Sequence, residues 1–109
     1  MTFPTNVPAV TIWAKDISGR APTFVRHVYG PSYWQDCRGE STARDPDDNT
    51  FAAIPATSLL DGYIPKKDDR ILPAASEAAS PPAGAMTITQ VKDFRYGSAF
   101  MQHIELTAK

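Results

Sequence analysis

The sequence predicts a mostly β fold, a small antiparallel β-barrel or sandwich that is closed or partly open, with long loops and at most one or two short helical turns. Short segments alternate apolar with polar residues and are rich in β-branched and aromatic side chains, which is typical of strands. Ten prolines in 109 residues exclude long helices and indicate many turns. Strands at such regular spacing favour a barrel or sandwich, whose closure protects the strand edges.

The first half of the chain contains four expected strands, each followed by turn residues. They are residues 7–15, Thr23–Tyr29, residues 33–37 and Thr50–Pro55. Gly19 and Pro22 mark the first turn, and Gly30-Pro31 marks the second. Residues 38–49 are polar and lack an apolar period, so we expect an exposed loop there.

The second half is predicted to contain shorter elements and a final hairpin. Residues 56–61 suit one helical turn capped by Thr57 or Ser58. A charged turn with a short strand at each end is expected over residues 62–72. The Ala/Ser/Pro-rich residues 73–84 favour a flexible excursion over a short helix at 74–79. Met86–Phe94 and residues 99–106 alternate well and predict a hairpin around a turn at residues 95–98.

Composition indicates one domain, residues 1–109, with no strong electrostatic preference. Eleven basic and twelve acidic residues leave a formal charge of -1, which provides no global attraction to nucleic acid or anionic membranes. No apolar run is long enough for a membrane span, and the N-terminus lacks a secretory signal pattern. Cys37 is the single cysteine, so no internal disulfide forms, and we expect it to be a small buried hydrophobe.

An acidic run, residues 45–49, is the nearest approach to a metal site. Asp45, Asp47 and Asn49 have the spacing of the first three ligands of an EF-hand loop. The glycine required at the sixth position is Thr50, and the glutamate required at the twelfth is Ala56. A solvated acidic loop is therefore predicted, and no metal or other cofactor is expected.

No catalytic motif stands out, so we expect a protein that is not an enzyme. Cys37 with His27 or His103 is a conceivable nucleophile pair, but no local signature surrounds the cysteine. The chain has too few cysteines and histidines for a zinc site of usual spacing. Asp68 and Asp69 lie between basic residues, which predicts a solvated charged turn rather than a general acid.

Two groups combine aromatic and basic residues. They are Tyr33, Trp34 and Arg38, and Phe94, Arg95 and Tyr96. Such groups stack single-stranded bases on some small barrels. They are also typical of protein interfaces, which are enriched in Trp, Tyr and Arg. Because the net charge is nearly neutral, an interface is favoured over base stacking, and core or rim packing is the third possibility.

Several short motifs follow one another in a distinctive order. They are Val10-Thr11-Ile12-Trp13, Arg26-His27-Val28, Tyr33-Trp34, the strand ending in Ile54-Pro55, Asp69-Arg70-Ile71, and residues 86–98 followed by the strand at 103–106. In this order the chain resembles, over nearly its whole length, the head–tail connector proteins of long-tailed bacteriophages. The similar proteins are the head-closure or stopper components, often described as minor capsid proteins. Residues 92–98 and the strand after them are the most similar part.

The resemblance implies a structural virion protein whose small β-barrels form a homo-oligomeric, dodecameric ring at the head–tail junction, after synthesis in the host cytoplasm. The implied partners are a portal or adaptor protein on one side and a tail terminator or tail tube on the other. Double-stranded DNA passes through the lumen without sequence recognition and is retained there after packaging. No membrane partner is implied.

The resemblance also suggests which residues act. The loop that faces the channel in such proteins corresponds to residues 38–49, whose candidate residues are Arg38, Glu40, Arg44, Asp45, Asp47, Asp48 and Asn49. Candidate ring or partner contacts are Tyr33, Trp34, Arg95 and Tyr96. Residues 73–84 depart from the family, which has a compact connection there. The alternatives are a tail terminator or other neck subunit, and a barrel that binds single-stranded nucleic acid.

Overall fold

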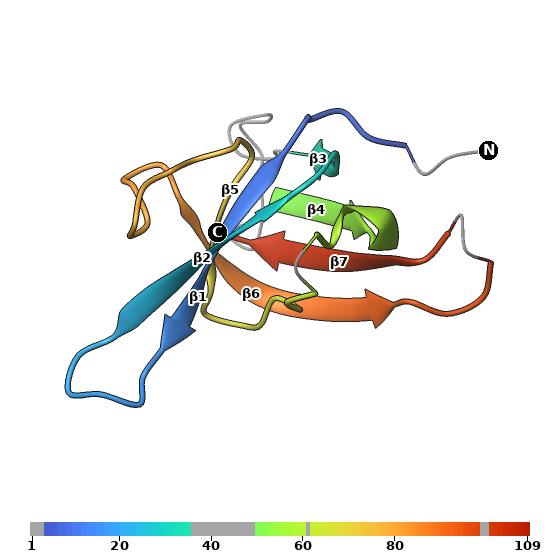
Figure 1. Cartoon of the computed structure of the whole chain (residues 1–109). Coiled ribbons are helices and arrows are strands. Elements are labelled where there is room, and N and C mark those ends of the chain that lie inside the picture. The colour runs from blue at the N-terminus through green and yellow to red at the C-terminus, as the bar shows by residue number, and fades with distance from the viewer. Residues whose placement is uncertain (1–3, 36–49, 61, 99–100) are drawn as a thin grey trace, which may run out of the picture.

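Seven antiparallel strands form one curled sheet that is not closed, in the order β2-β1-β5-β6-β7-β4-β3 (Figure 1). The computed structural model describes residues 4–35, 50–60, 62–98 and 101–109. The strands are β1 (Val10–Asp16), β2 (Thr23–Tyr29), β3 (Tyr33–Gln35), β4 (Thr50–Pro55), β5 (Arg70–Leu72), β6 (Met86–Phe94) and β7 (His103–Ala108). One 3-10 turn, η1 (Ala56–Ser58), follows β4. The predicted mostly β class is thus confirmed.

The core lies on the inner face of the curled sheet. Successive side chains of a strand point to opposite faces, so alternation places every second residue inward. The inward residues come from all strands except β3 and form one buried cluster, which consists of Val10, Ile12, Tyr29, Ala52, Ile54, Ile71, Met86, Ile88, Ile104, Leu106 and Ala108. A single sheet brings six strands to one cluster only by curling around it.

The two edges of the sheet are consecutive in the chain. Gly30 and the next two residues carry the chain from β2 to β3, and Val7 forms an isolated bridge with Ser32. Gly30 lies against η1, because its N–H donates to the carbonyl of Ser58 at 3.0 Å. A Cβ on Gly30 would lie 3.2 Å from the Ser58 Oγ, which explains why a residue without a side chain occupies this position.

Several boundaries differ from expectation. No strand forms at residues 63–65, where Pro65 lacks an N–H for a ladder. The predicted cap of η1 is also wrong, because Pro55 is the N-cap and Ser58 lies inside the turn, where its hydroxyl donates to the Pro31 carbonyl. β1 begins at Val10 and β7 at His103, each later than predicted, so the connection between β6 and β7 is longer than the expected turn.

Residues 73–84 contain neither helix nor strand, but they are hydrogen-bonded to the outer face of β1. The indole N–H of Trp13 donates to the Ala78 carbonyl at 2.9 Å, and the Thr11 hydroxyl accepts the N–H of Ser76 at 2.9 Å. Trp13 points away from the inner cluster yet is fully buried. The segment therefore covers Trp13, which differs from the flexible excursion expected there.

Candidate interaction sites

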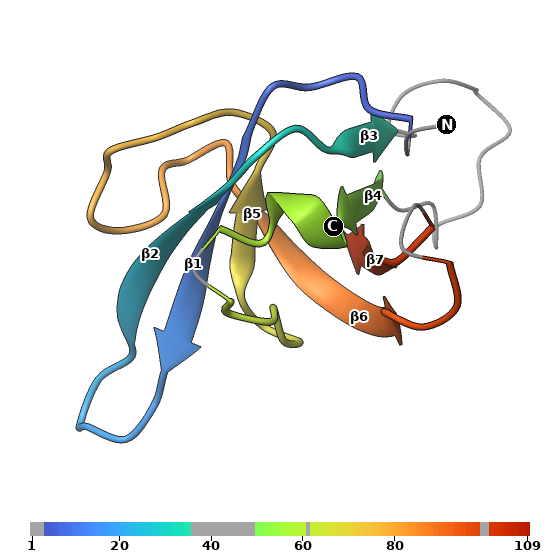
Figure 2. The ribbon, with the colours of Figure 1, turned by 45° about the vertical axis from the view of Figure 1, so that its right-hand side comes forward.

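A two-stranded arm projects from one end of the sheet (Figures 1 and 2). β1 pairs with β2 along its whole length, whereas β5 pairs with β1 only from Thr11 to Trp13. Beyond Trp13 the arm has no third strand. Ile17 and Val25 on the arm are therefore 74% and 53% exposed. Because Ile17 and Val25 line one depression, the arm is a candidate contact surface.

The buried carboxylate of Asp69 holds the base of the arm. Asp69 lies directly before β5 and is only 2% exposed. Its Oδ1 accepts the backbone N–H of Lys15 at 3.0 Å, and its Oδ2 accepts the Tyr63 hydroxyl at 2.6 Å and the Lys66 N–H at 2.9 Å. The expectation of a solvated turn is therefore wrong for Asp69, although its neighbour Asp68 is exposed. Three donors satisfy the carboxylate, as burial of a charged group requires.

The Tyr63 phenol in this network is a hydrogen-bond donor and not a reactive base. Burial raises the pKa of Tyr63 well above its usual range, and the hydrogen bond to Asp69 raises it further. The phenol therefore stays protonated at neutral pH. The His27 ring stacks on the Tyr63 ring with a centroid separation of 4.1 Å and an interplanar angle of 8°. The pair is an aromatic platform beside the arm.

An open groove of about 490 Å³ runs along the inner side of the arm. We call it the arm groove, and it is lined by Ala14, Lys15, Asp16, Ile17, Ser18, Val25, His27, Tyr63 and Lys66. Aliphatic side chains, an aromatic stack and two lysines thus meet in one concave surface. Sequence reasoning missed this site, because its members come from β1, β2, the turn between them and the segment before β5.

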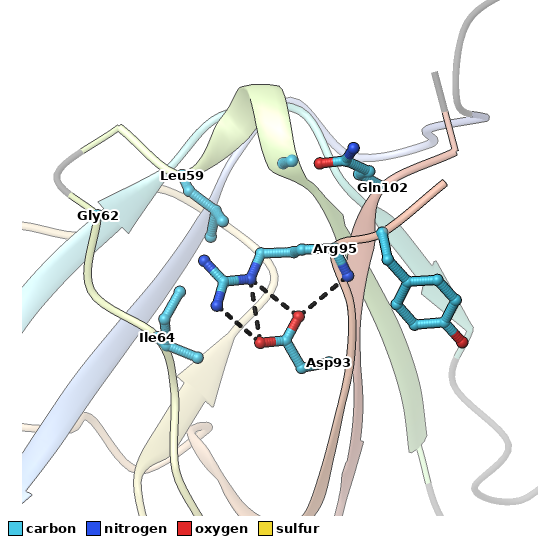
Figure 3. A pocket seen from close by; sticks show the side chains of 8 residues that line it. Leu59, Gly62, Ile64, Asp93, Arg95 and Gln102 are labelled. Atoms are coloured by element: carbon cyan, nitrogen blue, oxygen red, sulfur yellow. Dashed lines mark hydrogen bonds and ion pairs between the residues drawn. The ribbon is translucent and has the colours of Figure 1, made fainter. Parts of the chain in front are cut away.

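A second depression, of about 650 Å³, lies where β6 ends and β7 begins (Figure 3). We call it the mouth, and it is lined by Ala56, Leu59, Gly62, Ile64, Asp93, Arg95, Tyr96 and Gln102. Its lining residues Gly62 and Ile64 flank Tyr63 of the arm groove, so the two depressions share this segment. Leu59 and Ile64 approach the Arg95–Asp93 pair from the other side of the depression (Figure 3). The predicted contacts Arg95 and Tyr96 therefore share one concave surface.

Arg95 is engaged within the chain. Its Nη2 lies 2.7 Å from Asp93 Oδ2, and its Nε lies 2.8 Å from Asp93 Oδ1. The hydrogen bond from the guanidinium lowers the pKa of the Asp93 carboxyl and raises the pKa of Arg95. Both side chains are about two-fifths exposed, so this is a surface ion pair that provides the guanidinium with a partner inside the chain.

Tyr33 and Trp34 lie on opposite faces of β3. Trp34 packs against the buried cluster, and its backbone exchanges two hydrogen bonds with the Asn6 amide, at 2.7 and 2.8 Å. Tyr33 makes an edge contact with Phe51, at a centroid distance of 6.2 Å. The structure therefore separates the two residues from each other, and it separates β3 from Arg95 by two strands.

The remaining predicted sites concern residues that are not described or residues that have other partners. Residues 38–49, with every candidate channel-loop residue, and Cys37 lie outside the described residues. His27 stacks on Tyr63, whereas Nε2 of His103 lies 2.9 Å from Glu105. In the described part of the chain no three His, Cys, Asp or Glu residues cluster as metal ligands, and no helix is long and apolar enough to cross a membrane.

Comparisons of the chain with family models, with curated proteins and with solved structures give no significant match. The similarity to connector proteins stays an expectation from short sequence motifs, and the arm groove and the mouth are defined by this chain's own residues.

Proposed function

We propose that the protein is a non-enzymatic structural subunit of a phage head–tail connector ring, the head-closure or stopper component. In this role it associates with copies of itself, docks a portal or adaptor on one side and a tail terminator or tail tube on the other, and sits at the head–tail junction of the virion. The single observation that supports this most strongly is the projecting two-stranded arm, on which Ile17 and Val25 are exposed and which has no third strand beyond Trp13.

The arm suits assembly because it is both apolar and braced. A two-stranded ribbon on its own is marginally stable in water. Here Asp69 binds Lys15 at the point where the third strand ends, so the arm is held in place without a partner. A preorganised contact element loses little conformational freedom on binding.

The charges of the proposed channel loop suit passage of DNA. Residues 38–49 contain four acidic and two basic residues. A net negative segment repels phosphates, so a loop of this composition blocks or lines a channel without adding phosphate contacts that would hold DNA tightly. Retention of packaged DNA then depends on where the loop lies and not on affinity or base recognition.

The rival function, binding of single-stranded nucleic acid, has less support among the described residues. Base stacking on a barrel needs exposed aromatic and basic residues on a common face. Arg95 is paired with Asp93, and Trp34 packs against the core. A tail terminator remains the nearest alternative, because it also self-associates in the neck.

Assembly and DNA binding of the purified chain distinguish these functions. Native mass spectrometry over rising protein concentration is expected to show multimers that accumulate toward one closed size. Fluorescence titration with single-stranded DNA at low salt is expected to show no micromolar binding. A chain that stays monomeric at every concentration and binds single-stranded DNA with a steep salt dependence contradicts the proposal.

A further inference from the structure

The exposed large hydrophobic residues of the described chain fall into two groups, one on the arm and one around the mouth. Ile17 and Val25 lie on the arm, with 74% and 53% exposure. Leu60, Tyr96 and Met101 are 69%, 68% and 49% exposed, and each lines the mouth or adjoins a residue that does. The arm and the β6–β7 end point in different directions in both views (Figures 1 and 2).

Two separate apolar groups restrict how copies of the chain can associate. A two-fold contact between arms leaves the groups at both mouths exposed, and a two-fold contact between mouths leaves both arms exposed. Both groups are covered on every copy when the arm end of one copy meets the mouth end of another, either reciprocally in a two-fold dimer or head to tail, and of these the head-to-tail contact is the one that a ring subunit makes. Such contacts repeat around a ring if the rotation closes.

We propose that residues 95–98, here called the tip, dock with Tyr96 in the arm groove of the next copy. This proposal names the self-contact of the connector ring, and it rests on the proposed function. The groove provides the stacked rings of His27 and Tyr63 and the aliphatic side chains of Ile17 and Val25, which suit an incoming aromatic ring. Its volume of about 490 Å³ admits side chains of this size.

The charges at the two surfaces are compatible with docking. Asp93 neutralises Arg95, so the tip brings no unpaired charge from that pair into the groove. The charged residues that line the groove are Lys15, Lys66 and Asp16. A phenol hydroxyl can accept a hydrogen bond from an ammonium group or donate one to a carboxylate, so it is compatible with both kinds of charge. Tyrosine is also among the residues that contribute most to protein interfaces.

Ring closure explains how so small a contact is sufficient. Stable interfaces bury about 800 Å² on each partner, and five exposed side chains supply only part of that. A single tip-to-groove contact is therefore weak. In a closed ring each copy makes two such contacts, and the last one forms between copies that are already held together. Dimers are then expected to be scarce relative to closed rings.

Cross-linking of serine-to-cysteine variants tests this contact without altering Ile17 or Tyr96. In a Cys37→Ser background, Ser18→Cys places a thiol at the groove and Ser98→Cys places one at the last residue of the tip. The two variants are mixed and treated with a short bismaleimide. Covalent dimers are expected in the mixture and at several-fold lower yield with either variant alone. Adding Tyr96→Asp to the Ser98→Cys chain is expected to remove the mixed dimer.

The matched control is Ser80→Cys, an exposed serine in the segment that covers Trp13. It is expected to cross-link to Ser98→Cys only at background level. Equal yields with Ser80→Cys or equal yields from Ser18→Cys alone would overturn the docking. So would multimers seen by native mass spectrometry without the Ser18–Ser98 cross-link, although the connector function would then stand. If the cross-link forms but the protein is located elsewhere in the virion, the docking is supported and the connector function is contradicted.

Discussion

The carboxylate of Asp69 accepts the backbone N–H of Lys15 at 3.0 Å, directly before β5 begins. β5 pairs with β1 only as far as Trp13, so this N–H lies beyond the last residue of the third strand. A side chain therefore takes the place that a strand carbonyl would otherwise occupy. This substitution lets β1 and β2 continue as an arm with a satisfied backbone at its base.

Replacing Asp69 by Asn is expected to destabilise the domain by about 2 kcal/mol, because the amide group turns a donor toward N–H or O–H groups that need an acceptor. The matched control is Asp68→Asn, which removes the same charge one residue earlier. Asp68 is exposed and has a φ of 77°, a conformation that asparagine tolerates, so little change is expected. Urea denaturation measures the free energy of unfolding of both variants. Equal losses would contradict the role of Asp69 in holding the base of the arm.

The raised pKa of the Tyr63 phenol predicts that the folded state loses stability in alkaline solution. Burial and the bond to Asp69 raise its pKa in the folded state, so the folded protein keeps a proton that the unfolded chain loses above about pH 10. Its contribution is fully present below that pH and declines above it. Chemical denaturation between pH 8 and 11 is expected to show a steeper decline for the wild type than for Tyr63→Phe. Tyr96→Phe, at an exposed position, is expected to lose stability with pH as steeply as the wild type. An equally steep loss in all three proteins would show that Tyr63 is not the source of the pH dependence.

The attachment of residues 73–84 depends on Thr11. Its hydroxyl donates to the Ala74 carbonyl at 2.7 Å and accepts the Ser76 N–H at 2.9 Å. Thr11→Val keeps the side-chain shape but removes both bonds, so the Ser76 amide is expected to exchange hydrogen roughly tenfold faster, corresponding to about 1.4 kcal/mol. Thr57→Val, at an exposed position, is the control. Unchanged exchange at Ser76 in Thr11→Val would show that other contacts hold the segment.

Local pattern predicted much of the sheet. β2, β4 and β6 have the bounds that alternation indicates, because β-branched and aromatic residues on a period of two determine these strands locally. The same period also places Tyr33 and Trp34 on opposite faces, which argues against a single contact surface containing both.

Local alternation could not predict contacts between residues that are far apart in the sequence. Lys15 and Asp69 are 54 positions apart, and Trp13 and Ala78 are 65 apart, so no local periodicity signals either hydrogen bond. Asp69 in particular has basic neighbours on both sides in the sequence, which indicates a solvated turn. Its burial follows from the tertiary position of β5 beside β1. The arm groove was missed for the same reason.

Residues 38–49 are expected to be dispensable for folding. β3 and β4 are antiparallel neighbours, and Gln35 pairs with Phe51, so the two strand ends on either side of this segment already lie together. Replacing residues 38–49 by a short Asn-Gly turn is therefore expected to retain a cooperative melt. A matched deletion of residues 74–80, which uncovers Trp13, is expected to lower the melting temperature. Loss of the cooperative transition in the first variant would show that the segment is needed for the fold.

Cryo-electron microscopy of the tailed particle tests the connector function most directly. The account predicts a ring of copies of this fold between the portal or adaptor and the tail, with the segment between β3 and β4 directed at the channel. Density for the chain at any other place in the particle, or its absence from the assembled particle, would contradict the account.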